Sequence, residues 1–185
     1  MDHTALLIID MQNDYFEGGK YTLQNIAQAA ANAAGILAAF RKRGGAVFHI
    51  RHEILRKPAP FFEPGTEGAE IYGLLRPVRN ETVITKNFPN SFRDTALHGQ
   101  LQDLAVKELV ITGAMSHYCI DATTRAAVDL GYVCKVAHDA CATRDLAFNG
   151  ISVTAEQVHA GFMAALSMGY ASVLPTGKLI EGLSD

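Results

Sequence analysis

The stretch VITGAMSHYCIDATTRAAVDLGY, residues 110–132, carries the clearest structural signal in the chain. It begins inside the apolar run Glu108–Thr112, which is typical of a buried strand, and continues into a helix-period segment from His117 to Leu130. A second apolar run, Val133–His138, follows at once. A buried strand, a helix and another buried strand in succession are typical of a βαβ unit with parallel strands, so the stretch predicts an α/β fold.

The same alternation extends along the chain on both sides of this stretch. Further strands are predicted at residues 5–10, 46–51, 82–86 and 171–174, and further helices at residues 24–42, 94–104 and 154–167. Nearly continuous apolar strands such as LLII, residues 6–9, need cover on both faces of the sheet. The pattern predicts one domain over residues 1–185, a three-layer α/β/α sandwich around a six-stranded parallel sheet. Only the proline-rich segment 52–81 interrupts the alternation, and a long loop of this kind is usually functional.

The composition excludes several classes of partner. Charged residues make up 19% of the 185 residues and the formal net charge is −3, so no basic field would attract nucleic acid or anionic lipid. We therefore expect a small-molecule substrate, with no nucleic-acid or membrane partner. The run TALLIID near the start has no basic flank and is too short to span a bilayer, so we expect no signal peptide and a cytoplasmic protein. The three cysteines, at positions 119, 134 and 141, are odd in number and have no C-x-x-C spacing, which argues against a disulfide framework and against a thiolate zinc site.

Three chemically complementary residues come at or just after predicted strand ends. Asp10 and Lys86 end the first and third strands, and Cys119 follows the fourth by a short turn. Ligands bind beyond the carboxyl ends of strands in open α/β sheets, so these side chains are candidates for catalysis. With Ser116 as the expected N-cap, Cys119 would lie in the first helical turn, where free N–H groups lower a thiol pKa. A carboxylate could move the thiol proton and an ammonium could hold both anions. Taken singly, each residue has an ordinary structural interpretation; their joint placement favours the catalytic one.

Three segments resemble the signature segments of the isochorismatase-like cysteine hydrolases, which include nicotinamidases and N-carbamoylsarcosine amidohydrolase. They are ALLIIDMQNDYF (5–16), VITKNFPNSF (83–92) and the stretch at 110–132. The resemblance implies the sheet order 3-2-1-4-5-6 and a catalytic triad in which Asp10 is the general base for the nucleophile Cys119, with Lys86 as third member. It further implies a cis peptide between Ala114 and Met115 and an oxyanion hole formed by the N–H groups of Met115 and Cys119. In that order the backbone of Lys86 starts roughly 10 Å from Asp10, so its side chain must lean inward.

The sequence departs from the nicotinamidases after its second strand. Those enzymes carry an Asp-x-His-x-x-His metal site there, whereas this chain reads FHIRHEILRKPAPFF. His49 and His52 are three residues apart on a predicted strand and should point to opposite faces, so they cannot converge on one ion. We therefore expect no metal and no other cofactor.

The expected reaction is hydrolysis of a C–N bond in a small amide, ureido compound or lactam, through an acyl-thioester on Cys119. Two alternatives remain open at this point. One is an isochorismatase that protonates a vinyl ether with Asp10 and needs no cysteine; the other is a non-catalytic binding or assembly module on the same scaffold. The substrate would be chosen by the loop from Glu53 to Arg79 and by residues that follow the strand ends. The candidate substrate-binding residues are Gln12, Phe16, Phe88, Ser91, His117 and Tyr118. The resemblance also implies a homo-oligomer, a dimer or tetramer.

Overall fold

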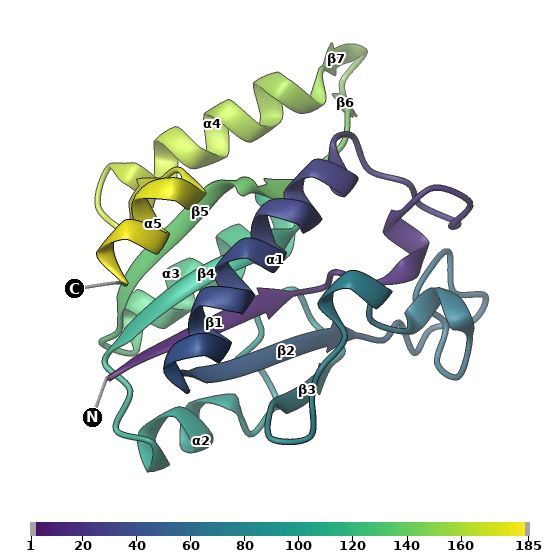
Figure 1. The fold of residues 1–185 in the computed structure, drawn as a ribbon. Helices are drawn as coiled ribbons and strands as arrows, with labels where there is room; N and C mark the ends of the chain where they lie inside the picture. Colours follow the sequence, from purple (N-terminus) through teal and green to yellow (C-terminus); the bar gives the residue numbers. More distant parts are fainter. Residues whose placement is uncertain (1–2, 184–185) are drawn as a thin grey trace.

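Six strands form one parallel sheet in the computed structural model, which describes residues 3–183 (Figure 1). The strands are β1 (Thr4–Ile9), β2 (Ala46–His52), β3 (Thr82–Lys86), β4 (Glu108–Ala114), β5 (Val133–Ala142) and β8 (Ser172–Leu174). Their order is β3-β2-β1-β4-β5-β8, which confirms the predicted order 3-2-1-4-5-6 when the sheet strands are counted along the chain. The central position of β1 places its carboxyl end between those of β2 and β4.

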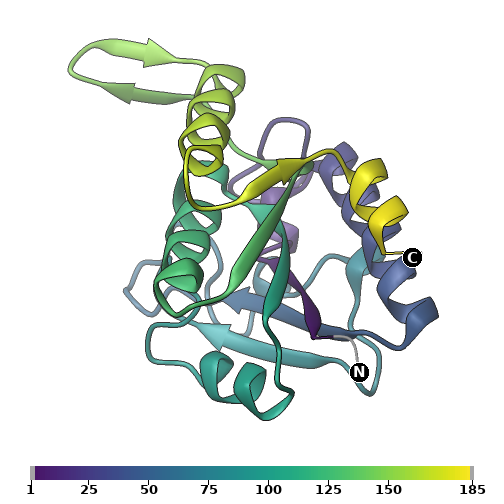
Figure 2. The ribbon, with the colours of Figure 1, turned by 90° about the vertical axis from the view of Figure 1, so that its left-hand side faces the viewer.

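Helices cover both faces of this sheet, which confirms the three-layer α/β/α architecture. On one face lie α1 (Ile26–Arg43) and α5 (Thr176–Gly182); on the other lie α2 (Leu97–Asp103), α3 (Asp121–Asp129) and α4 (Ala155–Ser167) (Figures 1 and 2). The side chains of β1 alternate between the two cores, with Leu6 in one and Leu7 in the other, and both are fully buried. Among the described residues no helix is long and apolar enough to cross a bilayer.

The alanine-rich helix α1 packs into the core. Ala30, Ala33, Leu37 and Phe40 are buried in the cluster that also contains Leu6 from β1 and Ala137 from β5. Small residues on the inner face of a helix allow its backbone to lie close to the sheet. Core packing therefore accounts for the apolar face of this helix.

Three features near the C-terminal part of the chain differ from the prediction. Strand β5 runs on past His138 to Ala142, and Asp139, a residue type that is common in turns, lies within it. Its Oδ1 accepts hydrogen bonds from the N–H and hydroxyl of Thr176, so it caps the start of α5. The short strands β6 (Leu146–Phe148) and β7 (Ile151–Val153) form a hairpin that projects from the body, with Phe148 81% exposed (Figure 2). Neither this hairpin nor α5 was predicted, because such short elements have too few residues to show a period.

The carboxylate of Glu81 links helix α1 to strand β2. Its carboxylate accepts two hydrogen bonds from Arg41 of α1, at 2.7 and 2.9 Å, and one from the backbone N–H of Val78, at 3.0 Å. It also contacts Nε2 of His49 in β2 at 2.8 Å. Burial opposes ionisation of Glu81, yet the hydrogen bonds from Arg41, Val78 and His49 lower its pKa to about 2. The carboxylate is therefore ionised throughout the neutral range.

We expect Glu81→Gln to lower the melting temperature at pH 7, with a difference from the wild type that shrinks as the pH falls. The depressed pKa contributes stability that is fully present above the unfolded value of 4.5 and is lost as the pH falls through the folded value near 2. Thermal unfolding at several pH values between 7 and 2 measures this. Glu181→Gln, which removes an exposed pair with Lys178, is the control and should shift little at any pH. A constant difference between Glu81→Gln and wild type across this range would contradict the assignment.

Candidate active site

The carboxyl ends of β1, β2, β3 and β4 bring the predicted catalytic residues together. Asp10 follows β1 directly and has a left-handed backbone (φ +54°), a conformation that aspartate tolerates better than most residues. Gly113 near the end of β4 pairs with Ile9 and also has a positive φ of +132°. A Cβ at Gly113 would collide with the carbonyl oxygen of Ile9, so glycine is required for this close approach of β4 to β1. The approach sets the segment that carries Cys119 beside Asp10.

Lys86 reaches across the end of β2 to join this pair. Its Nζ lies 2.8 Å from Oδ2 of Asp10 and 3.1 Å from Sγ of Cys119. The long side chain therefore leans inward, as the sheet order requires. The ammonium also donates to the backbone carbonyls of Phe88 and Pro89, at 3.1 and 3.3 Å. These contacts hold the nitrogen in place between the carboxylate and the sulfur.

The charges of the three groups balance in the buried site. Burial alone would raise the pKa of Asp10, but the Lys86 ammonium, with His52, lowers it below its ordinary value. Burial would likewise lower the pKa of Lys86, and the Asp10 carboxylate and Cys119 raise it instead. All three side chains are completely or almost completely buried. At neutral pH the stable arrangement is therefore carboxylate, ammonium and neutral thiol, which has no net charge.

The environment of Cys119 corrects two expectations. Residues Ser116–Ile120 form a π-helical turn whose N-cap is Met115, so Ser116 is not the cap and instead contacts Nδ1 of His159 at 2.8 Å. Burial, together with the Asp10 carboxylate, raises the pKa of the Cys119 thiol well above its ordinary value, although Lys86 opposes this. The expected lowering at a helix start was wrong, because complete burial next to a carboxylate outweighs the weak field of one turn. The peptide bond between Ala114 and Met115 is cis.

His52, the last residue of β2, is a member of the site that the sequence analysis missed. Its Nδ1 lies 3.3 Å from Nζ of Lys86, 3.6 Å from Oδ2 of Asp10 and 3.8 Å from Sγ of Cys119. The imidazole of His52 therefore contacts every member of the predicted triad through this one nitrogen. The sheet order could have predicted this position. Strand β2 lies between β3 and β1, so its last residue must lie between Lys86 and Asp10. His49, by contrast, turns to Glu81, which confirms that the two histidines point to opposite faces.

The donor atoms of Asp10, His52 and Cys119 lie within 4.8 Å of one another, close enough to share a metal ion. The Lys86 ammonium, however, contacts all three of these atoms. A second cation would have to displace it and would leave the lysine buried beside a positive charge. The donor set therefore does not suit a metal, and an active site without a metal stays our prediction.

A cavity of about 630 Å³ opens beside this cluster. His52 and Met115 line it, and the buried sulfur of Cys119 lies in contact range of His52. Of the predicted substrate-binding residues, Phe88, His117 and Tyr118 line the cavity. The segment 53–79 contributes to the same wall through Ile54, Leu55, Arg56, Pro60 and Phe61.

Three predicted substrate-binding residues are placed elsewhere, which corrects their assignment. Gln12 is fully buried; its amide donates to the carbonyls of His52 and Ala69 and accepts from the His52 N–H. Phe16 stacks on Tyr72 with ring centres 3.6 Å apart, and Ser91 is buried against the hydroxyl of Thr123 at 2.8 Å. None of the three lines the cavity. Polar residues near a strand end can hold the loops as readily as a substrate, and the sequence pattern does not separate the two roles.

Replacing Gln12 by alanine should therefore destabilise the fold without a direct effect on substrate binding. The change leaves buried backbone groups of His52 and Ala69 without partners, and we expect a loss of about 2 kcal/mol in the free energy of unfolding. Urea unfolding measures it, with Gln28→Ala on the exposed side of α1 as a control that should change by less than about 0.5 kcal/mol. If Gln12→Ala left the stability unchanged and raised KM, Gln12 would be a substrate-binding residue after all.

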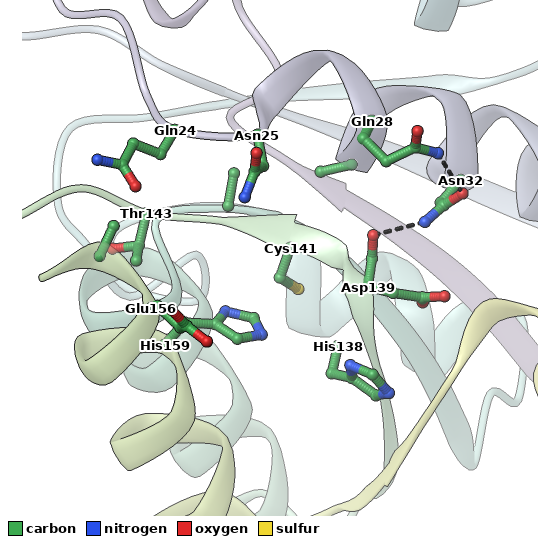
Figure 3. Close-up of a pocket in the computed structure, with 13 residues that line it drawn as sticks. Gln24, Asn25, Gln28, Asn32, His138, Asp139, Cys141, Thr143, Glu156 and His159 are labelled. Carbon is green, nitrogen blue, oxygen red and sulfur yellow. Dashed lines mark hydrogen bonds between the residues drawn. The ribbon is translucent and has the colours of Figure 1, made fainter.

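A second cavity, of about 590 Å³, lies between α1, α4 and the end of β5 (Figure 3). Two of its polar side chains are engaged within the lining: Gln28 donates to Asn32, and Asn32 donates to the carbonyl of Asp139. His159 lines this cavity, and its ring contacts the hydroxyl of Ser116, the residue that follows Met115. His52 and Met115, which adjoin the triad, line the first cavity and not this one, so the first cavity is the candidate active site.

Comparison with known proteins shows the family of this chain. Residues 4–173 match the family model described as the isochorismatase domain. The chain belongs to the isochorismatase family. It is 55% identical over 178 residues to the isochorismatase family protein YddQ of Bacillus subtilis, covering 96% of this chain and 99% of YddQ.

Two further relatives show the fold and a named activity within the family. The crystal structure of an isochorismatase hydrolase from Oleispira antarctica superimposes with a TM-score of 0.94 at 55% identity, covering 97% of this chain and 96% of that one. Ureidoacrylate amidohydrolase RutB of Variovorax paradoxus is 26% identical over 173 residues, 74% of this chain and 68% of that enzyme. The protein is thus a hydrolase of the isochorismatase family.

Proposed function

We propose that this hydrolase cleaves the C–N bond of a small amide, ureido compound or lactam, with Cys119 as nucleophile. The observation that carries the proposal is the position of the Lys86 ammonium, 2.8 Å from the Asp10 carboxylate and 3.1 Å from the Cys119 sulfur. One cation thereby holds a base and a nucleophile together. The activity in the name of RutB, an amidohydrolase, agrees with this chemistry.

In the first half of the reaction the Cys119 thiol passes its proton to Asp10 as Sγ attacks the carbonyl carbon. The negative charge that develops on the carbonyl oxygen is received by the N–H groups of Met115 and Cys119. The C–N bond then breaks, and the amine leaves with the proton that Asp10 received. The product of this half is an acyl-thioester on Cys119.

In the second half water attacks the thioester carbon and gives a proton to Asp10. The C–S bond breaks, the acid leaves, and the proton returns to the Cys119 sulfur. Water is consumed, and an amine and an acid are formed. Because the thiol is neutral at rest, each half needs Asp10 as an ionised base, and Lys86 keeps it ionised.

The ionised state of Asp10 also weighs against the vinyl-ether alternative. A residue that protonates a vinyl ether must carry a proton, yet Lys86 and His52 lower the pKa of Asp10 below its ordinary value. A non-catalytic module, in turn, has no need for a cysteine buried in contact with a lysine and a carboxylate. Both alternatives are therefore less well supported than C–N hydrolysis.

A panel of primary amides, N-carbamoyl amino acids and lactams tests the proposal, with isochorismate as the vinyl-ether probe. Release of ammonia or ring opening by the wild type, absent in Asp10→Asn, is the expected result. Turnover of isochorismate with no activity on any member of the panel would favour the alternative. Activity on neither would support the non-catalytic reading.

A further inference from the structure

The walls of the active-site cavity carry no negative charge. Among the described residues that line it none is acidic, and Arg56 carries the one permanent charge. Much of the remaining wall is aromatic and includes Tyr15, Tyr21, Phe61 and Phe88. A cavity with flat apolar walls and a single guanidinium favours a ligand that has a planar or apolar body and an anionic group.

The guanidinium of Arg56 is available for such a group. Within residues 3–183 it has no ion pair and no side-chain hydrogen bond, and the residue is exposed at the cavity. Arg51, only a few residues earlier, is by contrast engaged with Glu53 at 3.1 Å and Glu70 at 3.6 Å. The segment therefore supplies acidic partners for one arginine and leaves the other facing the cavity.

Two further arginines increase the positive potential around the cavity. The Arg93 guanidinium lies 3.7 Å from the ring centre of Phe88, and that of Arg144 lies 4.2 Å from the ring centre of Tyr21. Arg93 also forms an ion pair with the exposed Asp94 at 3.7 Å, so Arg144 contributes more clearly to the positive potential. The charge of Arg144 acts on a residue of the cavity wall: the pKa of His117 is lowered first by burial and second by this charge.

We propose that the substrate is an anionic amide or ureide, in which a carboxylate remote from the cleaved C–N bond is bound by Arg56. The inference rests on the proposed function for the bond that is cleaved, but not for the recognition of the anion. The aromatic walls hold the body of the molecule and Arg56 selects its charge. A cationic analogue of the same shape is disfavoured by the same arginines.

Three amides of similar shape test this charge preference: benzamide, 4-carbamoylbenzoate and the cation 4-(aminomethyl)benzamide. Binding is measured by calorimetry to Cys119→Ala, so that no turnover is needed. We expect 4-carbamoylbenzoate to bind about tenfold more tightly than benzamide, and the cation more weakly than either. In Cys119→Ala/Arg56→Gln the preference for the anion should disappear while the affinity for benzamide stays the same. The matched control is Cys119→Ala/Arg79→Gln, which removes an exposed arginine of the same segment that does not line the cavity.

The outcomes separate this inference from the proposed function. Three results would overturn the anion site: equal affinity for the anion and the neutral amide, no binding of either, or a preference for the anion that survives Arg56→Gln. In each case the proposed function still stands if the wild type hydrolyses any amide and this hydrolysis needs Cys119. A preference that depends on Arg56, with no amide hydrolysed by the wild type, supports the anion site and removes the proposed function. In turnover by the wild type, loss of Arg56 should raise KM for the anionic amide about tenfold and leave kcat unchanged.

Discussion

Cys119→Ala should reduce hydrolysis of the best amide substrate at least about 1000-fold, because the variant has no group that can form the covalent intermediate. The fold should persist, since the change removes one sulfur atom from a buried site. Steady-state kinetics, with ammonia release as the signal and circular dichroism as the check on folding, measure the effect.

Cys134→Ala is the matched control for this prediction. It removes the same atom from another buried cysteine, which lies in β5 and packs in the core. We expect its activity to stay within about twofold of the wild type, because a small core change acts on stability and not on the reacting atoms. Full activity in Cys119→Ala would refute the nucleophile and restore the vinyl-ether reading.

Lys86→Met should destabilise the protein by about 3 kcal/mol or more at pH 7, because it leaves the Asp10 carboxylate buried without its counter-ion. The double variant Lys86→Met/Asp10→Asn removes both charges and should recover most of that stability. Neither variant should hydrolyse amides, since the first lacks the cation that keeps Asp10 ionised and holds it beside the thiol, and the second also lacks the base itself. Urea unfolding and the same kinetic assay test the two statements together.

The stability difference between Lys86→Met and the wild type should depend on pH. The lowered pKa of Asp10 contributes stability that is present above its unfolded value of 3.8 and is lost as the pH falls below it. Lys86→Met should therefore lose less stability than the wild type on acidification. Lys135→Met, which breaks a half-exposed pair with Glu108, is the control and should cost less than about 1 kcal/mol. A Lys86→Met protein as stable as the wild type at pH 7 would mean that the ammonium does not hold Asp10 ionised.

The fold could be predicted because its strands are buried on both faces. A run such as LLII in β1 supplies both cores at once, and only a sheet with helices on each side can use such a strand. The hairpin β6–β7 shows the limit: its strands are short and Phe148 at its end is exposed, so burial imposes no pattern on it. The end of β5 was missed because Asp139 resembles a turn residue, whereas its carboxylate caps α5, far along the chain.

The site could be predicted in part from the positions of residues at strand ends. Asp10, Lys86 and Cys119 meet as expected, because the carboxyl ends of parallel strands share one edge of the sheet. His52 needed the sheet order as well as the sequence, since only its position between β1 and β3 places it beside Asp10. The thiol pKa could not be obtained from a local pattern, because it depends on burial and on the charge of a residue from another strand.

The central claim is that Cys119 carries the acyl group between two half-reactions, and partition to hydroxylamine tests it most directly. Two amides with the same acyl group and different leaving amines are hydrolysed by the wild type in the presence of hydroxylamine, and the ratio of hydroxamate to acid is measured for each. A shared acyl-thioester loses all memory of the amine, so the account predicts the same ratio for both amides and no hydroxamate with Cys119→Ala. Ratios that differ between the two amides, or hydrolysis that yields no hydroxamate, would contradict a covalent intermediate on Cys119.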